Sequence, residues 1–156
     1  MELQDLAKSV QLAWHGVNDP INLRHFLNSS IEWGEGDLRQ DGQGRLVLRH
    51  DSFETHPLSP GESLLLFQDW LESIHSRGKK IKVDMKEGGE TVRKMESVLK
   101  GNGFKESDLW LTTNFKDMSI EEFGKLRDVF PKVIFQSTVP LRFMFQVMTP
   151  EERNDF

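Results

Sequence analysis

Short β-like runs alternate with amphipathic helical segments along this sequence, and this alternation constrains the fold more than any other feature. The runs that we predict as strands cover residues 11–15, 31–39, 45–50, 80–86, 109–113 and 133–138, with a further candidate at 143–148. Alternating βα units are typical of a mainly parallel sheet covered by helices. The sequence therefore predicts an α/β protein.

Helix starts are marked by residues that satisfy the free backbone amides of a first turn. Asp19 followed by Pro20 predicts an N-cap and a first helical residue, and capping boxes occur at 59–62, 119–122 and 149–152. Only four residues follow the last box. A complete (β/α)8 barrel takes about 250 residues. We therefore expect one domain over residues 1–156 with a partial TIM-type (β/α) barrel, roughly its first five to six strands, truncated at the C-terminus.

Composition excludes several functional classes. The net charge of −5 disfavours a nucleic-acid-binding surface, which needs clustered basic residues. No stretch approaches the ~20 apolar residues of a transmembrane helix, and the acidic start of the chain does not resemble a secretory signal, so we expect a cytoplasmic protein. Because the chain has no cysteine, any metal must be held by oxygen or imidazole, which favours a hard cation.

Charged residues occupy alternate positions in two predicted strands. Glu35 and Asp37 lie two residues apart, and Lys82, Asp84 and Lys86 alternate with apolar residues in KIKVDMK. Side chains alternate between the faces of a strand, so each charged set shares one face. The apolar set must pack under helices. The charged sets then point into the barrel, near the C-terminal strand ends where barrel enzymes place their sites.

Three carboxylates that converge in a protein interior repel one another unless positive charge offsets them. A magnesium or calcium ion is the natural partner for an oxygen-only set, which here comprises Glu35, Asp37 and Asp84. Lys86 could meet a substrate phosphate as a point charge. His15 and His50 each end a predicted strand and would supply an acid/base pair near neutral pH.

Each of these residues also has an ordinary structural interpretation. A histidine at a strand end is more often structural than catalytic, and Glu35 and Asp37 could be the solvent-facing stripe of an edge strand. Gly34 and Gly36 favour the functional interpretation. Glycine weakens a strand but leaves room for close packing on the opposite face, and such a local cost usually marks function.

The ordered motifs WHGVND, GEGDLRQDG, VLRHD and KIKVDMK resemble those of the glycerophosphodiester phosphodiesterases and their phospholipase-C-like relatives. The menorin-like branch looks closest, because it shares an HGVN- or HAVN-like opening, a KLDFK-like third strand, a VWLNAD-like segment and an FP-x-V-x-F segment. The spacing of the histidines and acids is also similar to that of sphingomyelinase D. The resemblance covers about residues 10–140.

This resemblance implies a role for individual residues. Glu35, Asp37 and Asp84 would bind one magnesium or calcium ion, His15 and His50 would act as acid and base on a phosphodiester, and Lys86 would help to hold the phosphate. Asn18 matches the menorin-like asparagine, and we expect Asn18 and Lys82 to bind substrate beside Lys86.

Two features depart from the family's pattern. His56, in Thr55-His56-Pro57, resembles a menorin-like AHPP motif and is the alternative second histidine; we favour His50 because it ends a strand on the parity of Leu46 and Leu48. Thr112, Thr113 and Asn114 replace the polar pair expected after VWL, which puts a polar role of that strand in doubt.

We therefore expect a metal-dependent phosphodiester hydrolase whose partner is a small-molecule phosphodiester or a lipid head group. Two alternatives stay open: a non-catalytic binding module on the same scaffold, and an inactive fragment of a larger barrel enzyme. His25 and His75 lie in helical segments and are expected at the surface. The apolar stretch 133–148 predicts a homo-oligomer or poor solubility.

Overall fold

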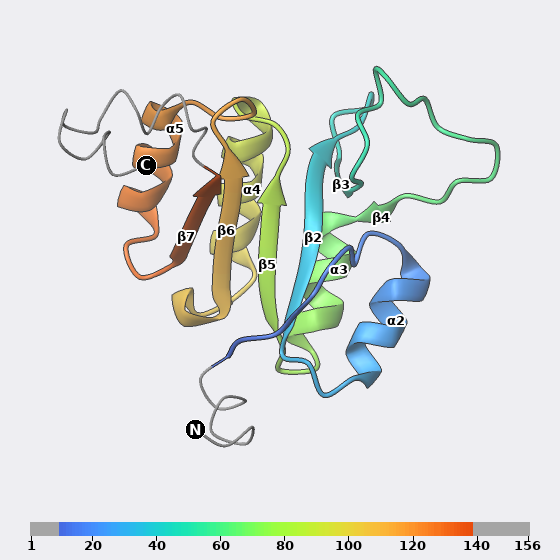
Figure 1. Cartoon of the computed structure of the whole chain (residues 1–156), viewed down its shortest axis with the longest axis horizontal. Helices are drawn as coiled ribbons and strands as arrows, with labels where there is room; N and C mark the ends of the chain where they lie inside the picture. Colours follow the sequence, from blue (N-terminus) through green and yellow to red (C-terminus); the bar gives the residue numbers. More distant parts are fainter. Residues whose placement is uncertain (1–9, 139–156) are drawn as a thin grey trace, which may run out of the picture.

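A computed structural model describes residues 10–138 of the chain as a twisted sheet with helices packed against it (Figure 1). The strands are β1 (Ala13–Trp14), β2 (Trp33–Gln40), β3 (Leu46–Leu48), β4 (Leu65–Leu66), β5 (Lys80–Met85), β6 (Leu109–Asn114) and β7 (Ile134–Thr138). The helices are α2 (Pro20–Asn28), α3 (Phe67–His75), α4 (Glu90–Gly101) and α5 (Ile120–Val129), with a 3-10 turn at Glu106–Asp108.

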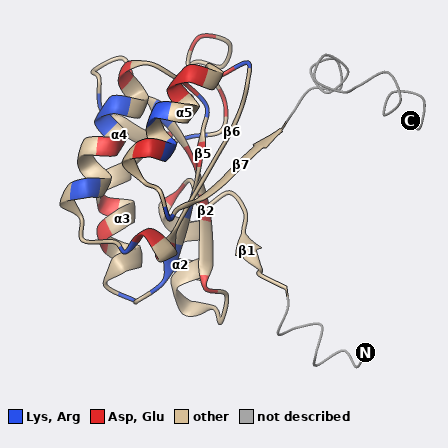
Figure 2. Cartoon of the chain, turned by 90° about the vertical axis from the view of Figure 1, so that its left-hand side faces the viewer, with Lys and Arg blue, Asp and Glu red and all other residues tan. Residues whose placement is uncertain are grey.

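The sheet has the order β4-β3-β2-β5-β6-β7, and β1 also pairs with β2. The pairs β1–β2, β2–β5, β5–β6 and β6–β7 are parallel, whereas β3 and β4 form antiparallel additions at the edge. Helices α3, α4 and α5 gather on one side of this sheet, and the opposite face is left open by them (Figure 2). The five parallel strands and their crossover helices confirm the predicted partial barrel.

The two faces of β5 differ as the alternation of its sequence predicts. Ile81, Val83 and Met85 are fully buried in the hydrophobic core under the helices. Lys82 and Asp84 are half-buried on the open face. The charged side chains therefore project from the face that would line a barrel.

Gly34 and Gly36 let two helices approach the back of β2 closely. A Cβ atom on Gly34 would lie 2.6 Å from the Phe26 ring of α2. One on Gly36 would lie 2.4 Å from Leu48 and 3.0 Å from Trp70 of α3. These two glycines therefore provide the packing space that the sequence suggests for them.

Two predictions of local structure need correction. The strand predicted at 45–50 is present but shorter, at Leu46–Leu48, and it pairs antiparallel with β2, so it is a hairpin arm and not a barrel strand. No helix starts at 59–62, because Gly61 adopts φ +82 and turns the chain; Glu62 accepts a 3.1 Å hydrogen bond from the Ser59 backbone within this turn. The helix that follows begins at Phe67.

The other two helix starts within the described chain are confirmed. Asp19 accepts hydrogen bonds from the amides of Ile21 and Asn22, and Ser119 forms a complete capping box with Glu122. The candidate strand 143–148, the capping box at 149–152 and most of the apolar stretch 133–148 lie outside the described residues. None of the helices described between residues 10 and 138 is long and apolar enough to span a membrane.

Candidate active site

His15 and Glu35 meet where β1 ends beside β2. The parallel pairing of Trp14 with Gly34 carries the next residues forward side by side, so His15 Nδ1 lies 2.9 Å from Glu35 Oε2. The Lys82 ammonium approaches the same oxygen at 3.5 Å. The Glu35 side chain is only 9% exposed and the His15 side chain 74% exposed. The hydrogen bond to Glu35, and then the charge of that carboxylate, raises the pKa of His15.

Asp37 lies at the centre of a second group on the same face. Its side chain is only 1% exposed, and its Oδ1 atom lies 2.9 Å from the Lys86 ammonium. That ammonium also contacts Asp84 Oδ2 at 2.5 Å. Asp37 and Asp84 are register partners in the β2–β5 pair, which brings their carboxylates to one lysine. The predicted convergence of Glu35, Asp37 and Asp84 on one face is therefore observed.

Negative charge is in excess in this cluster. Burial raises the pKa of Asp84, and the charges of Asp37 and Glu35 act in the same direction, whereas the hydrogen bond from Lys86 opposes the rise. Burial by itself would lower the pKa of Lys86. Its contacts with Asp84 and Asp37 outweigh this effect and raise that pKa. The three carboxylates are therefore only partly offset by the two lysines beside them.

The chemistry of this oxygen-only set suits a hard divalent cation. As the side chains stand, however, no group of three or more His, Asp or Glu side chains among residues 10–138 is arranged to hold a metal ion. The Lys86 ammonium contacts the two aspartates that would share such an ion. Cation binding by these residues therefore requires Lys86 to move away from them.

His50 is placed less favourably than His15. Its side chain is 66% exposed, and its Nδ1 atom lies 2.9 Å from Asp51. The parity argument from Leu46 and Leu48 fails, because Leu48 pairs with Leu38 and packs in the core under the helices, on the face opposite to Asp37. The strand ends at Leu48, so the chain is free to turn before His50.

His50 nevertheless lines a pocket beside the acidic cluster. This pocket has a volume of about 610 Å³ and is lined by Asn18, Asp19, Leu48, Arg49, His50, Asp51, Thr55, His56, Pro57, Ser59 and Glu62. Asn18 connects the two regions, because its carboxamide hydrogen-bonds to Asp37. His56 is also exposed and contacts Thr55. Both candidate second histidines therefore face the same pocket.

Arg39 is a site residue that our sequence analysis missed. Its Nε and Nη2 atoms donate to the His50 carbonyl at 3.1 and 2.9 Å, and its Nη1 atom donates to Glu87 at 3.1 Å. The arginine thus ties the segment that carries His50 to the loop after β5. Its position two residues after Asp37, on the same face of β2, was the signal that could have identified it.

The strand β6 also places polar side chains, those of Thr112 and Asn114, on this face. Thr112 is buried beside Asp84, its register partner on β5. Thr113 faces the other way and donates to the Met85 carbonyl at 3.0 Å, and the Asn114 carboxamide is bonded to Asp117. On the same face, two residues nearer to the start of each strand, the Lys82 ammonium lies 4.8 Å from the centre of the Trp110 ring. As predicted, His25 and His75 are exposed on helices.

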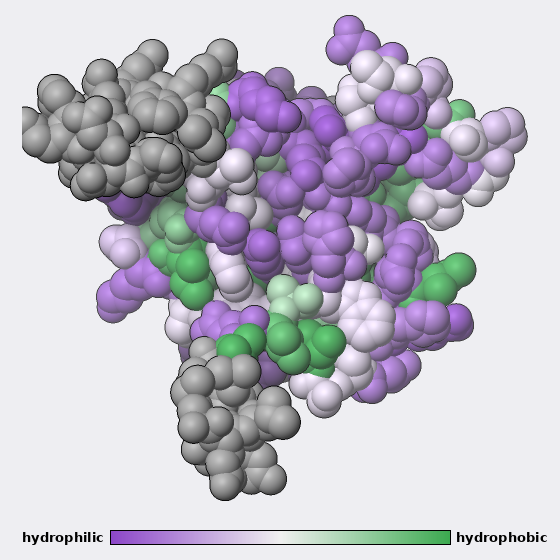
Figure 3. Space-filling model, in the orientation of Figure 1, coloured by the Kyte–Doolittle hydropathy of each residue, from purple (hydrophilic) through white to green (hydrophobic). Residues whose placement is uncertain are grey.

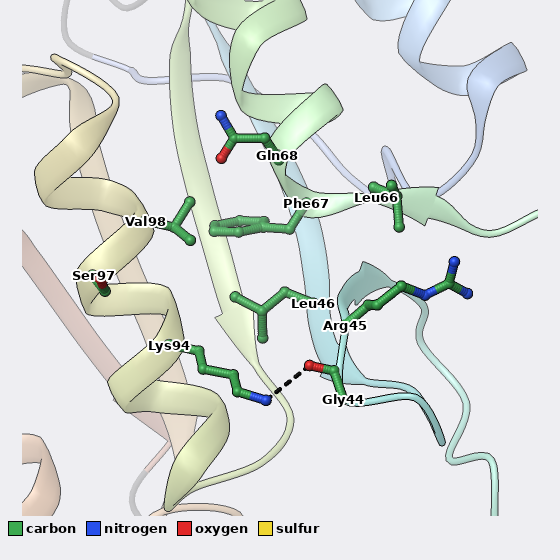
Figure 4. A pocket seen from close by; sticks show the side chains of 9 residues that line it. All are labelled: Gly44, Arg45, Leu46, Leu66, Phe67, Gln68, Lys94, Ser97 and Val98. Atoms are coloured by element: carbon green, nitrogen blue, oxygen red, sulfur yellow. Dashed lines mark hydrogen bonds between the residues drawn. The ribbon is translucent and has the colours of Figure 1, made fainter.

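The open face of the sheet is largely hydrophilic around the ends of β2 and β5 (Figure 3). A different, mainly apolar hollow lies on the helix-covered side, between α3, α4 and the β3 arm (Figure 4). Leu46, Phe67 and Val98 line it, and Lys94 closes one end by donating to the Gly44 carbonyl at 2.8 Å. The sheet separates this hollow from the acidic cluster.

Solved structures show what this arrangement resembles. A phosphodiesterase of Oleispira antarctica, solved in complex with the product sn-glycerol-3-phosphate, matches 86% of this chain and 65% of its own with a TM-score of 0.62 and 16% identity. A glycerophosphodiester phosphodiesterase of Agrobacterium tumefaciens matches 74% of this chain and 58% of its own, with a TM-score of 0.56 and 16% identity.

A third structure, a glycerophosphodiester phosphodiesterase of Parabacteroides distasonis, matches 81% of this chain and 61% of its own, with a TM-score of 0.58 and 12% identity. The chain has the glycerophosphodiester phosphodiesterase fold. It spans between 58% and 65% of the length of these three structures. No family model and no curated protein sequence matches it.

These structures confirm the fold that the resemblance to the glycerophosphodiester phosphodiesterases implies. These structures do not distinguish the menorin-like and sphingomyelinase D branches, so both finer assignments stay predictions. Within the glycerophosphodiester phosphodiesterase fold, His15 directly follows β1 and Asp84 is the last residue but one of β5, and Glu35 and Asp37 from the middle of β2 lie beside them, so the cluster lies toward the C-terminal ends of β1 and β5. This is the end of the sheet where barrel enzymes place their sites.

Proposed function

We propose that this protein is a divalent-cation-dependent phosphodiesterase that acts on a small glycerophosphodiester or a lipid head group. The observation that carries the proposal is the convergence of His15, Glu35, Asp37 and Asp84, with two lysines, on the open face of a sheet with this fold. The Oleispira antarctica enzyme, solved with sn-glycerol-3-phosphate, motivates the substrate class.

Glu35, Asp37 and Asp84 would hold a magnesium or calcium ion once Lys86 moves off the aspartates. Such an ion supplies electrostatic stabilisation of the charge that develops on the phosphoryl oxygens. Lys86 and Lys82 are both on β5 and project from the open face, where they can bind a substrate phosphate as point charges. The chain's own cations thus compensate part of the substrate's charge.

His15 and His50 would move the protons of the reaction. One imidazole removes a proton from the nucleophile, which is water or a neighbouring hydroxyl of the substrate, and the other protonates the leaving alcohol. Glu35 orients the His15 ring through the 2.9 Å contact at Nδ1, which leaves the other ring nitrogen exposed for proton transfer. Asp51 contacts Nδ1 of His50 in the same manner.

A second candidate function is a non-catalytic module that binds a phosphorylated small molecule. It is favoured by the position of Lys86, whose ammonium holds Asp37 and Asp84 in place of a metal ion. A protein of this kind would bind sn-glycerol-3-phosphate and release no alcohol from any phosphodiester.

Turnover measurements on the purified chain test the first function against the second. Glycerophosphodiesters and lysophospholipids are incubated with Mg2+ or Ca2+, with and without a chelator, and the released alcohol is measured. We expect release only with the cation. His15→Gln and His50→Gln should each reduce kcat by roughly 10²- to 10⁴-fold, the usual contribution of a general acid or base.

His25→Gln is the matched control, since His25 is an exposed histidine on α2. This variant should retain full turnover, and circular dichroism should show that all three variants are folded. An unchanged rate in His15→Gln would remove His15 from the mechanism. Binding of sn-glycerol-3-phosphate without turnover on any substrate would favour the non-catalytic module.

A further inference from the structure

The segment that follows β1 contacts β2 at several positions. The pairing of Trp14 with Gly34 continues as the His15–Glu35 contact, and the Val17 amide then donates to the Glu35 carbonyl at 2.7 Å. Val17 is fully buried and anchors this segment. The chain is thereby brought forward until Asn18 lies beside Asp37.

Asn18 uses both ends of its carboxamide on Asp37. Its Oδ1 atom accepts from the Asp37 backbone amide at 2.8 Å, and its Nδ2 atom donates to Asp37 Oδ2 at 2.5 Å. Only one orientation of the carboxamide is compatible with these partners, because a backbone N–H can only donate and an ionised carboxylate can only accept. The pair therefore forms a closed two-bond clamp.

Because of this clamp, the two carboxylate oxygens of Asp37 have different partners. Oδ2 is taken by Asn18, whereas the buried Oδ1 accepts no hydrogen bond of good geometry from residues 10–138 and lies 2.9 Å from the Lys86 ammonium. The charge on Oδ1 is thus directed at the centre of the cluster. Without Asn18, no other side chain described between residues 10 and 138 hydrogen-bonds to Oδ2, and the contact of Oδ1 with Lys86 alone would orient the buried carboxylate.

We propose that Asn18 is a positioning residue that orients the Asp37 carboxylate, and that it is not primarily a substrate-binding residue. The proposal extends the proposed phosphodiesterase function, because it assigns to Asn18 an effect on catalysis that acts through Asp37. Removal of a residue that orients a metal-binding or catalytic carboxylate typically costs roughly 10- to 100-fold in activity or metal affinity. A substrate contact would instead affect KM.

The test compares Asn18→Ala and Asn18→Asp with the parent chain. Asn18→Asp has nearly the same shape, but it loses the Nδ2 donor and places a second carboxylate against Asp37. We expect kcat to fall by roughly 10- to 100-fold in both variants, with KM changed by less than about threefold. Asn28→Ala, at the exposed end of α2, is the control and should behave as the parent.

A structural readout accompanies the kinetics. Amide hydrogen exchange of Asp37 should accelerate by roughly tenfold in Asn18→Ala, because its amide loses the acceptor on Asn18. A raised KM with unchanged kcat would overturn the proposal and make Asn18 a substrate contact. If the parent chain hydrolyses no phosphodiester, the proposed function fails by itself; equal exchange of the Asp37 amide in parent and variant would then overturn the positioning role as well.

Discussion

Gly34 and Gly36, on the helix-covered face of β2, help to determine where the acidic side chains of this strand lie. Because neither has a side chain, Phe26 and Trp70 pack directly against the strand. Glu35 and Asp37 alternate with these glycines and project to the other face. The close helix packing behind the strand therefore fixes the backbone from which both carboxylates extend.

Gly36→Ala should destabilise the protein by about 1–3 kcal/mol, the usual range for overpacking a filled core. The added methyl would lie 2.4 Å from Leu48 and 3.0 Å from Trp70, so both side chains must shift. Gly42→Ala is the control, because a Cβ at that hairpin position meets no atom within 4 Å. Urea unfolding measures the difference, and equal stability of the two variants would show that the packing behind β2 is loose.

At the scale of elements, Glu122 joins α5 to the loop that follows β5. Its carboxylate completes the capping box with Ser119 and also accepts a 2.6 Å hydrogen bond from the Gly89 amide. These bonds, led by that of Gly89, lower the pKa of Glu122. The ionised carboxylate is therefore favoured in the folded protein, and its stabilising effect is present above the pKa that it has when unfolded.

Glu122→Gln should lower the stability by roughly 1 kcal/mol at pH 7, since a hydrogen bond to a charged acceptor is replaced by one to a neutral acceptor. The difference from the parent should shrink as the pH falls below about 4.5, the ordinary pKa of a glutamate, because Glu122 then becomes protonated in the unfolded chain first and in the folded protein at lower pH. Thermal unfolding of both proteins between pH 7 and pH 3.5 measures this trend. Glu121→Gln breaks only the exposed ion pair of Glu121 with Lys125 and is the comparison, so it should change the stability at pH 7 less than Glu122→Gln does. A difference for Glu122→Gln that stays constant with pH would contradict the assignment.

Elements that depend on local signals were predictable, and those that depend on distant partners were not. The alternation of buried and less buried side chains in β5 and the capping box at Ser119 follow from short-range rules, and both are observed. The antiparallel course of β3 was missed, although residues 41–45 are too few for a parallel crossover, which takes a dozen or more residues.

The residues of the site divide in the same way. Alternation placed Glu35, Asp37 and Asp84 on one face. Nothing local indicates that Arg39 would reach the His50 carbonyl, or that Asn18 would clamp Asp37 from 19 positions away in the sequence. These contacts depend on how β1 and β3 lie against β2, which only the folded sheet specifies.

At the scale of the whole molecule, the candidate site exists only when two separate βα units have paired. Asp37 belongs to β2 and Asp84 to β5, and their side chains are brought together by the register of that pair. A ligand that needs both carboxylates therefore binds the folded sheet and not the unfolded chain. Such binding must raise the stability of the folded state as the ligand concentration rises.

Thermal unfolding in Mg2+ or Ca2+ tests this coupling without any substrate. At a cation concentration 100 times Kd, the folded chain should gain about 2.7 kcal/mol, which corresponds to an increase in Tm of roughly 5–10 °C. A chelator should reverse the increase. Asp84→Asn should abolish it, since one shared ligand is lost, whereas Glu121→Gln, on an exposed helix surface, should retain it. An equal increase in Asp84→Asn would place the cation elsewhere. If the parent chain has the same Tm with and without cation, no ion displaces Lys86 from Asp37 and Asp84.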